Sequence, residues 1–329
     1  MSRIFFEQLD LPTPDLYLGV GSGRHGAQTA AILQAIETHL IENRPDVMVV
    51  VGDVNSTVAA TLAAVKLHIP VAHVEAGLRS FDRSMPEEIN RLITDAISDA
   101  LYVSEESGLK HLRQEGIPDE RVVFVGNVMI DSLVRFREKA SALDIAQSMF
   151  GLDQGSYLLV TLHRPSNVDH PERLAVIASI LDAIQQRIPV VFPIHPRTQQ
   201  RLNAQGLNAR LEALPNLHVS PPVGYLEFMS LMQNAKGMLT DSGGTQEETT
   251  FLGVPCLTLR DNTERPVTVE LGTNTLLPLD AERILSHIDV ILTTQPTKPT
   301  PPPLWDGRAA ERIAADLVAR YGSSLQPLV

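Results

Sequence analysis

Residues 237–248 read Gly-Met-Leu-Thr-Asp-Ser-Gly-Gly-Thr-Gln-Glu-Glu and contain the strand-to-helix junction that decides the fold. The apolar run 237–240 has the length of a buried strand, and the acidic stretch after Gly244 is typical of a helix start. The glycines between them let an anion approach the backbone, where amides at a helix N-terminus point toward it. The junction therefore predicts an α/β domain that binds a phosphate or a diphosphate.

The same alternation of short apolar runs and amphipathic stretches extends over the whole chain, as parallel sheets covered on both faces require. Strands are expected at 47–51, 70–74, 100–103, 122–125, 157–162, 190–194, 218–220, 237–240 and 256–259. Helices are expected at 58–67, 87–98, 128–140 and 307–321, and the proline-rich stretch 296–303 reads as a surface linker. We expect two doubly wound, Rossmann-like domains facing a cleft, at 1–140 and 141–306, followed by a terminal helical segment at 307–329.

Composition limits the partners and the location. The net charge of −12 argues against nucleic acid or an anionic membrane as the main partner, because both need a basic face. The apolar runs are well short of the ~20 residues that a membrane helix needs. The apolar stretch at the N-terminus is too short, and its surroundings too polar, for a signal peptide. We therefore expect a cytoplasmic protein. The one cysteine, Cys256, lies in an apolar run and is expected to be a core residue.

Polar residues follow the expected strands in both halves of the chain. In open α/β sheets the ligand crevice lies beyond the carboxyl ends of the strands, so these residues are candidates for a shared site. They include carboxylates, imidazoles and guanidiniums, at Asp53, Glu75, Arg79, His163, His195, Asp241 and Arg265. Loops are often polar without any function, but six such loops in both halves favour a binding cleft.

Three motifs have competing interpretations. The stretch 21–26 matches the glycine pattern G-x-G-x-x-G after a possible strand at 16–18, but Asp53 lies late for the acid of a dinucleotide site. His73 and Glu75 would share one face of a strand, but a third metal ligand is missing at convincing spacing. We therefore expect neither nicotinamide nor metal. In the stretch 86–91, a proline is followed by two acids, a pattern that a helix start explains without any function. The residues alone do not decide between this structural role and a functional one.

Eight segments together resemble bacterial non-hydrolysing UDP-N-acetylglucosamine 2-epimerases, in family order from Met1 to about Tyr321. These segments are 52–57, 73–79, 86–91, 126–127, 161–164, 193–195, 240–248 and 263–266. The resemblance implies two Rossmann-like domains of the GT-B type, with the last helix crossing back to the first domain. It implies interconversion of UDP-GlcNAc and UDP-ManNAc by a homodimer, in polysaccharide biosynthesis, without metal or nicotinamide.

The resemblance also implies site residues, because the family eliminates UDP across C1–C2 to give a glycal and then re-adds it. A base, an acid and a stabilised leaving group are needed. By matched position Asp53, Glu75 and Glu87 are the expected catalytic carboxylates, His195 assists near the departing phosphate, and Arg91 tunes Glu87. The assignment of each carboxylate to one face of C2 stays open. The expected substrate-binding residues are His163, Val223, Phe228, Ser242, Gly243, Gly244, Glu248 and Arg265.

Within that set, residues 242–244 are expected to hold the diphosphate and Glu248 the ribose. Phe228 is expected to stack on uracil while the backbone around Val223 meets its edge. Arg265 is expected to be a further cation at the substrate. A UDP-sugar glycosyltransferase of the same fold would also use the 241–248 segment, but it would leave the three carboxylates without a joint role.

Two departures from the family pattern stand out. Met1 aligns after the family's first βαβ unit, so we expect the first domain to lack its N-terminal strands, together with an arginine and a lysine of the active site. A catalytically impaired UDP-sugar binder is therefore a further alternative. The stretch His163–Asn167 also differs from the histidine-arginine-arginine-glutamate version linked to activation by UDP-GlcNAc, and such activation is not expected here.

Overall fold

A computed structural model describes residues 9–294 and 300–322, which form two compact units. One unit comprises residues 13–131 and 303–322, and the other comprises 9–12, 132–294 and 300–302. The division falls inside helix α6 (Val128–Ser141) rather than after residue 140, and the chain returns to the first unit at 303 rather than 307. Residues 296–299 of the expected linker lie outside the described residues, and 300–303 contain no helix or strand.

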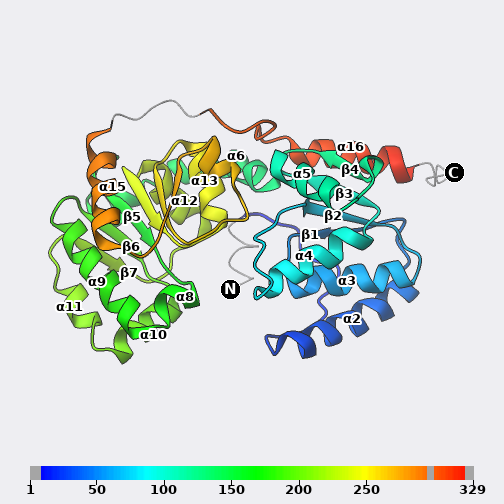
Figure 1. The fold of residues 1–329 in the computed structure, drawn as a ribbon, viewed down its shortest axis with the longest axis horizontal. Coiled ribbons are helices and arrows are strands. Elements are labelled where there is room, and N and C mark those ends of the chain that lie inside the picture. Colours follow the sequence, from blue (N-terminus) through cyan, green and yellow to red (C-terminus); the bar gives the residue numbers. More distant parts are fainter. Residues whose placement is uncertain (1–8, 295–299, 323–329) are drawn as a thin grey trace. The chain divides into compact units, whose positions relative to one another are not determined.

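The first unit is built on a four-stranded parallel sheet (Figure 1). Its strands, in spatial order, are β1 (Met48–Val51), β2 (Val71–Ala76), β3 (Ala100–Val103) and β4 (Val122–Phe124). The helices of this unit are α2 (His25–Glu42), α3 (Asn55–Lys66), α4 (Pro86–Ile97), α5 (Glu106–Gln114), the 3-10 turn Asp119–Arg121 and α16 (Ala309–Tyr321). Strand β2 lies inside the sheet and is almost wholly buried, since helices must cover both faces of a parallel sheet.

The C-terminal helix α16 belongs to this first unit. Ile313 on α16 joins the core cluster that contains Tyr102 of β3, and the Tyr102 hydroxyl donates to Asp316 at 2.9 Å. Just before the helix, the buried Trp305 donates its indole N–H to the Ser104 carbonyl at 2.9 Å. Both contacts stabilise the return of the chain to the sheet.

The second unit has a six-stranded parallel sheet in the order β10-β9-β8-β5-β6-β7 (Figure 1). The strands are β5 (Leu158–Thr161), β6 (Val190–Pro193), β7 (Leu217–Ser220), β8 (Gly237–Thr240), β9 (Cys256–Leu259) and β10 (Asn274–Leu277). The helices are α7 (Ile145–Phe150), α8 (Pro165–Val168), α9 (Pro171–Gln185), α10 (Pro196–Ala204), α11 (Asn208–Glu212), α12 (Tyr225–Asn234), α13 (Gly244–Leu252), α14 (Val267–Glu270) and α15 (Ala281–Thr293). This is the doubly wound Rossmann order, in which the chain direction across the sheet reverses between β5 and β8.

The nine expected strands are confirmed within one or two residues at their ends, but the sequence did not predict β10. β10 opens with Asn274 and Thr275, whose polarity hides the strand pattern. Asn274 is nevertheless buried, because its amide donates to the side-chain oxygen of Gln246 at 3.0 Å.

The glycine-rich stretch 21–26 is not preceded by a strand in the structure. Residues 16–18 are neither helix nor strand, and α2 begins at His25, inside the pattern. A dinucleotide-binding motif needs a strand directly before the glycines, so the structure does not support that interpretation. Cys256 lies fully buried in β9, as predicted.

None of the described helices combines the length and the apolarity that crossing a lipid bilayer requires.

Candidate functional site

Glu75 lies at a distortion near the end of β2. Its backbone has a φ of +69°, and the pairing register with β3 shifts between Val74 and Ala76. A left-handed backbone costs a non-glycine residue about 1–2 kcal/mol, and such outliers cluster at active sites. His73 is fully buried, whereas Glu75, at the distortion, is half-buried. The strained backbone marks Glu75 as a candidate site residue.

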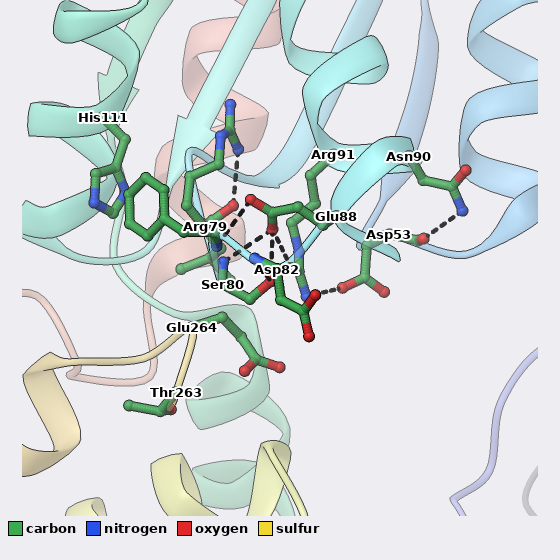
Figure 2. Close-up of polar contacts among 12 residues, drawn as sticks. Asp53, Arg79, Ser80, Asp82, Glu88, Asn90, Arg91, His111, Thr263 and Glu264 are labelled. Atoms are coloured by element: carbon green, nitrogen blue, oxygen red, sulfur yellow. Dashed lines mark hydrogen bonds and ion pairs between the residues drawn. The ribbon is translucent and has the colours of Figure 1, made fainter. Parts of the chain in front are cut away.

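Asp53 and Arg91 form an ion pair at the carboxyl end of β1, which Figure 2 shows. Asp53 Oδ2 lies 2.6 Å from a guanidinium nitrogen of Arg91, and the Asp53 carbonyl accepts the side-chain amide of Asn90 at 2.9 Å. Arg91 and Asn90 both come from α4, so this helix positions the turn that carries Asp53. The Asp53 side chain is 27 % exposed and the Arg91 side chain 3 %.

Arg91 contacts Glu88 as well as Asp53, and this second pairing differs from the expectation that Arg91 tunes Glu87. Glu88 Oε2 lies 2.9 Å from Arg91, and the same carboxylate accepts the Ser80 amide and hydroxyl and the Phe81 amide at 2.9–3.1 Å. Burial raises the pKa of Glu88, but these bonds outweigh it and hold the pKa below its usual range. Glu88 is therefore a buried, ionised anchor for the 80–81 turn.

Sequence reasoning did not identify Glu88 as a site residue. The three-residue spacing from Glu88 to Arg91 on a helix permits an ion pair, but so does the four-residue spacing from Glu87. The pattern alone could not choose between them. The choice is made by the Ser80–Phe81 turn, whose amides need a buried acceptor, and that turn is a tertiary feature.

Glu87 lies in the first turn of α4, half-buried, and has no hydrogen-bond or ion partner among residues 9–294 and 300–322. Together with Asp53 and Asn55 it lines a pocket of about 310 Å³ in this unit. Of the carboxylates on α4, Glu87 is thus the one available to exchange a proton with a ligand. Asp53 is the second carboxylate on that pocket.

In the second unit, the switch point between β5 and β8 is organised by the fully buried Asp241. Its carboxylate accepts the backbone amides of His163 and Arg164 and the Asn167 side chain at 3.0–3.1 Å. These bonds join the loop after β5 to the loop after β8. Ligands of doubly wound sheets bind at this position.

The N-terminus of α13 lies beside this switch point and has the composition of an anion site. Gly243 is the residue before the helix and Gly244 its first residue, so their amides have no acceptor within the helix. A Cβ added to Gly243 would lie 3.0 Å from the Arg265 guanidinium, which shows how closely that cation approaches. Arg265 is itself paired with Glu247 and Glu264, at 2.8 and 3.1 Å. The Ser242 amide donates to the Thr240 hydroxyl at 3.0 Å, and a diphosphate-binding role for the Ser242 side chain stays a prediction.

Two imidazoles lie near each other in this unit. The rings of His163 and His195 are 5.4 Å apart, and burial lowers the pKa of His163, assisted by Arg164 and His195 and opposed by Asp241. His195 is exposed before α10, and its Nδ1 accepts the Arg197 amide at 3.1 Å. Because Nδ1 is an acceptor, the neutral ring of His195 carries its proton on Nε2.

The expected nucleoside-binding residues surround the start of α12 and the middle of α13. Val223 and Phe228 are partly buried against one core cluster, which also contains Tyr157 and Leu231. Glu248 is buried and accepts the Tyr225 hydroxyl at 3.2 Å. Burial raises the pKa of Glu248 to about 7, with Glu247 adding to the rise and Tyr225 opposing it.

The model of the family "UDP-N-acetylglucosamine 2-epimerase" matches residues 1–318 of this chain. A UDP-N-acetylglucosamine 2-epimerase of Methanocaldococcus jannaschii is 44% identical over 326 residues, covering 98% of this chain and 88% of the relative. The chain belongs to the UDP-N-acetylglucosamine 2-epimerase family.

Two further relatives place the chain within this epimerase family. The crystal structure of a Methanocaldococcus jannaschii UDP-GlcNAc 2-epimerase in complex with UDP-GlcNAc and UDP matches with a TM-score of 0.87, covering 97% of this chain and 88% of that one. The Pseudomonas aeruginosa UDP-2,3-diacetamido-2,3-dideoxy-D-glucuronate 2-epimerase is also 44% identical, over 84% of this chain and 76% of the relative. The predicted fold is confirmed: both units are Rossmann-like domains of the GT-B type.

The predicted epimerase residues fall into two sets, one in each unit. The first unit holds Asp53, Glu75, Glu87 and Arg91, and the second unit holds His163, His195, Val223, Phe228, Ser242, Gly243, Gly244, Glu248 and Arg265. Within the first set, Asp53 and Glu87 line one pocket, and within the second, Arg265 approaches Gly243.

A pH dependence of stability follows from Glu248. Its pKa is raised from 4.5 to about 7 in the folded epimerase, so the folded state binds more protons than the unfolded state between those values. Stability is therefore highest below about pH 4.5 for this group and is lost as pH rises through 7. We expect Glu248→Gln to gain about 2.5 kcal/mol relative to the native chain between pH 5 and pH 8. Urea unfolding at both pH values measures this gain, and a constant difference would contradict the assignment.

Proposed function

We propose that this chain interconverts UDP-N-acetylglucosamine and UDP-N-acetylmannosamine by inverting C2 of the sugar. The proposal rests on one observation above all: Glu87, which has no bonding partner among the described residues, lies on a pocket shared with Asp53, in a chain that matches the epimerase family over 1–318. The matched complex with UDP-GlcNAc and UDP supports a UDP-sugar substrate.

The reaction requires a general base and a general acid. C2 is not adjacent to a carbonyl carbon, so its hydrogen is not acidic. In the proposed reaction a carboxylate removes that proton while UDP leaves C1, which gives a glycal and UDP. Re-addition of UDP, with a proton delivered to the other face of C2, gives the epimer. Glu87, Asp53 and the strained Glu75 are the proposed carboxylates, and Arg91 holds Asp53 in place.

The second unit would stabilise the leaving UDP. The amides of Gly243 and Gly244 and the nearby Arg265 suit the negative charge that develops on the diphosphate. His195 would donate its Nε2 proton to a phosphate oxygen, since its Nδ1 already accepts the Arg197 amide. Phe228 would stack on uracil beside the backbone of Val223, while His163 and Glu248 would contact the substrate, Glu248 at the ribose.

A second candidate substrate is favoured by the Pseudomonas relative, which is named for a diacetamido uronic acid. Both candidates share UDP and a C2 acetamido group and differ at C3 and C6. We propose UDP-GlcNAc as the substrate, because the matched family model and the Methanocaldococcus relative carry that name.

Incubation of the purified chain with each UDP-sugar, followed by proton NMR of the anomeric signals, tests the proposal. We expect a UDP-ManNAc doublet to appear from UDP-GlcNAc without any added acceptor. Conversion of the UDP-diacetamido uronic acid but not of UDP-GlcNAc would show the same C2 epimerisation with a different substrate. Release of UDP only when an acceptor sugar is added would instead support the glycosyltransferase.

We also propose that the enzyme works as a cytoplasmic homodimer that supplies an activated sugar for polysaccharide synthesis. The family resemblance supports these points. Light scattering coupled to size exclusion should give twice the mass of 36.0 kDa, and a mass of one chain would contradict the dimer.

A further inference from the structure

The imidazole of His73 lies fully buried on β2, where each ring nitrogen meets an oxygen atom. Its Nδ1 lies 2.7 Å from Oδ1 of Asp95, and its Nε2 lies 2.8 Å from the backbone carbonyl oxygen of Gly52. A carbonyl oxygen can only accept a hydrogen bond, so Nε2 of His73 carries a proton.

Whether Nδ1 of His73 also carries a proton depends on the protonation state of Asp95. Its Oδ2 accepts the Gly77 amide at 3.0 Å and lies 2.7 Å from the Arg79 guanidinium. Burial raises the pKa of Asp95, but the contacts with His73 and Arg79 outweigh burial and lower it. An ionised carboxylate is an acceptor only, and therefore Nδ1 of His73 must donate as well.

The surrounding charges suit an imidazolium. Arg79 bonds both Asp95 and Glu115, at 2.7 Å each, so it does not fully neutralise Asp95 by itself. Among the described residues, Arg121 contacts only backbone carbonyls at the end of α4, and the neighbouring strands β1 and β3 carry no charged side chain. A buried carboxylate without a matching cation is costly, and a positive His73 supplies that cation.

The His73–Asp95 pair bonds the backbone on both sides of the candidate carboxylates. His73 holds the carbonyl of Gly52, whose φ of +69° turns the chain directly before Asp53. Asp95 holds the amide of Gly77, two residues after the strained Glu75. We infer that His73 is an imidazolium that acts as a positioning residue, fixing the Asp53 turn relative to the Glu75 turn. The positioning role rests on the proposed function, whereas the protonation state does not.

Nitrogen-15 NMR of the histidine-labelled full chain tests the protonation state at pH 7.5 without any substrate. We expect His73 to show a bonded proton on both ring nitrogens. His111 is the internal control: its Nδ1 lies 2.9 Å from the Gly77 carbonyl, and it has no second acceptor in the described part of the chain, so we expect one proton only. An unprotonated nitrogen on His73 would overturn the inference.

Kinetics of His73→Gln tests the positioning role. We expect kcat to fall roughly 10²-fold, as small misplacements of catalytic groups do, with UDP affinity and KM within about twofold of the native values. His287→Gln on α15, in the other unit, is the control and should leave kcat unchanged. A folded His73→Gln chain with native kcat would overturn the positioning role, and if that variant does not fold, the NMR result still decides the inference. A doubly protonated His73 in a chain without epimerase activity would refute the proposed function alone.

Discussion

Replacing Glu87 with glutamine is expected to lower kcat for C2 epimerisation by about 10³-fold, within the range of general acid–base catalysis. Glutamine keeps the size of the side chain but cannot take or give the proton. Because Glu87 has no bonding partner in residues 9–294 and 300–322, the change breaks no contact of the fold. UDP affinity should stay within about twofold, since the proposed diphosphate site lies in the other unit. Steady-state kinetics and calorimetric titration with UDP measure the two quantities.

Glu106 offers a matched control, because it is also an acid in the first turn of a helix but is exposed. Glu106→Gln should leave both kcat and UDP affinity unchanged. Native turnover in Glu87→Gln would remove Glu87 from the mechanism, and loss of UDP binding would show that its role is not proton transfer.

Replacing Arg91 with methionine is expected to destabilise the first unit by about 3–5 kcal/mol, the usual cost of removing one partner of a buried ion pair. The Arg91 side chain is 3 % exposed, and without it the equally buried Glu88 would keep its charge with no paired cation in the described part of the chain. The turn at Asp53 would also lose its ion pair, so activity should fall along with stability. Thermal and urea unfolding of the variant measure the loss.

Arg113→Met is the control for that measurement. Arg113 pairs with Asp119 at 3.4 Å, but the two side chains are 71 % and 78 % exposed. Exposed pairs contribute about 0–1 kcal/mol, so this variant should unfold close to the native midpoint. Equal stability of the two variants would mean that the Arg91 network does not stabilise the unit.

Most of the architecture could be read from the sequence because buried parallel strands are continuous apolar runs. Strands such as Ala100–Val103 and Gly237–Thr240 are short, predominantly apolar runs and appear with the expected ends. Strand β10 was not predicted because Asn274 is polar. The burial of Asn274 depends on its hydrogen bond with Gln246, a residue on another element.

The candidate site could be read less completely, because its details depend on tertiary contacts. The residues that follow strands pointed to Asp53, Glu75 and the glycines of α13, since the end of a strand is a local signal. The distorted backbone at Glu75 and the choice of Glu88 as the partner of Arg91 have no local signal. The Glu88 pairing depends on the Ser80–Phe81 turn, which reaches Glu88 only in the folded chain.

The most direct test of the proposed function is the fate of the C2 hydrogen in heavy water. The purified chain is incubated with UDP-GlcNAc in deuterium oxide, and proton NMR follows the C2 position of both sugars. Elimination and re-addition predict that UDP-ManNAc appears carrying deuterium at C2, and that deuterium also enters the recovered UDP-GlcNAc. A folded chain that binds UDP but gives neither UDP-ManNAc nor deuterium at C2 would contradict the account.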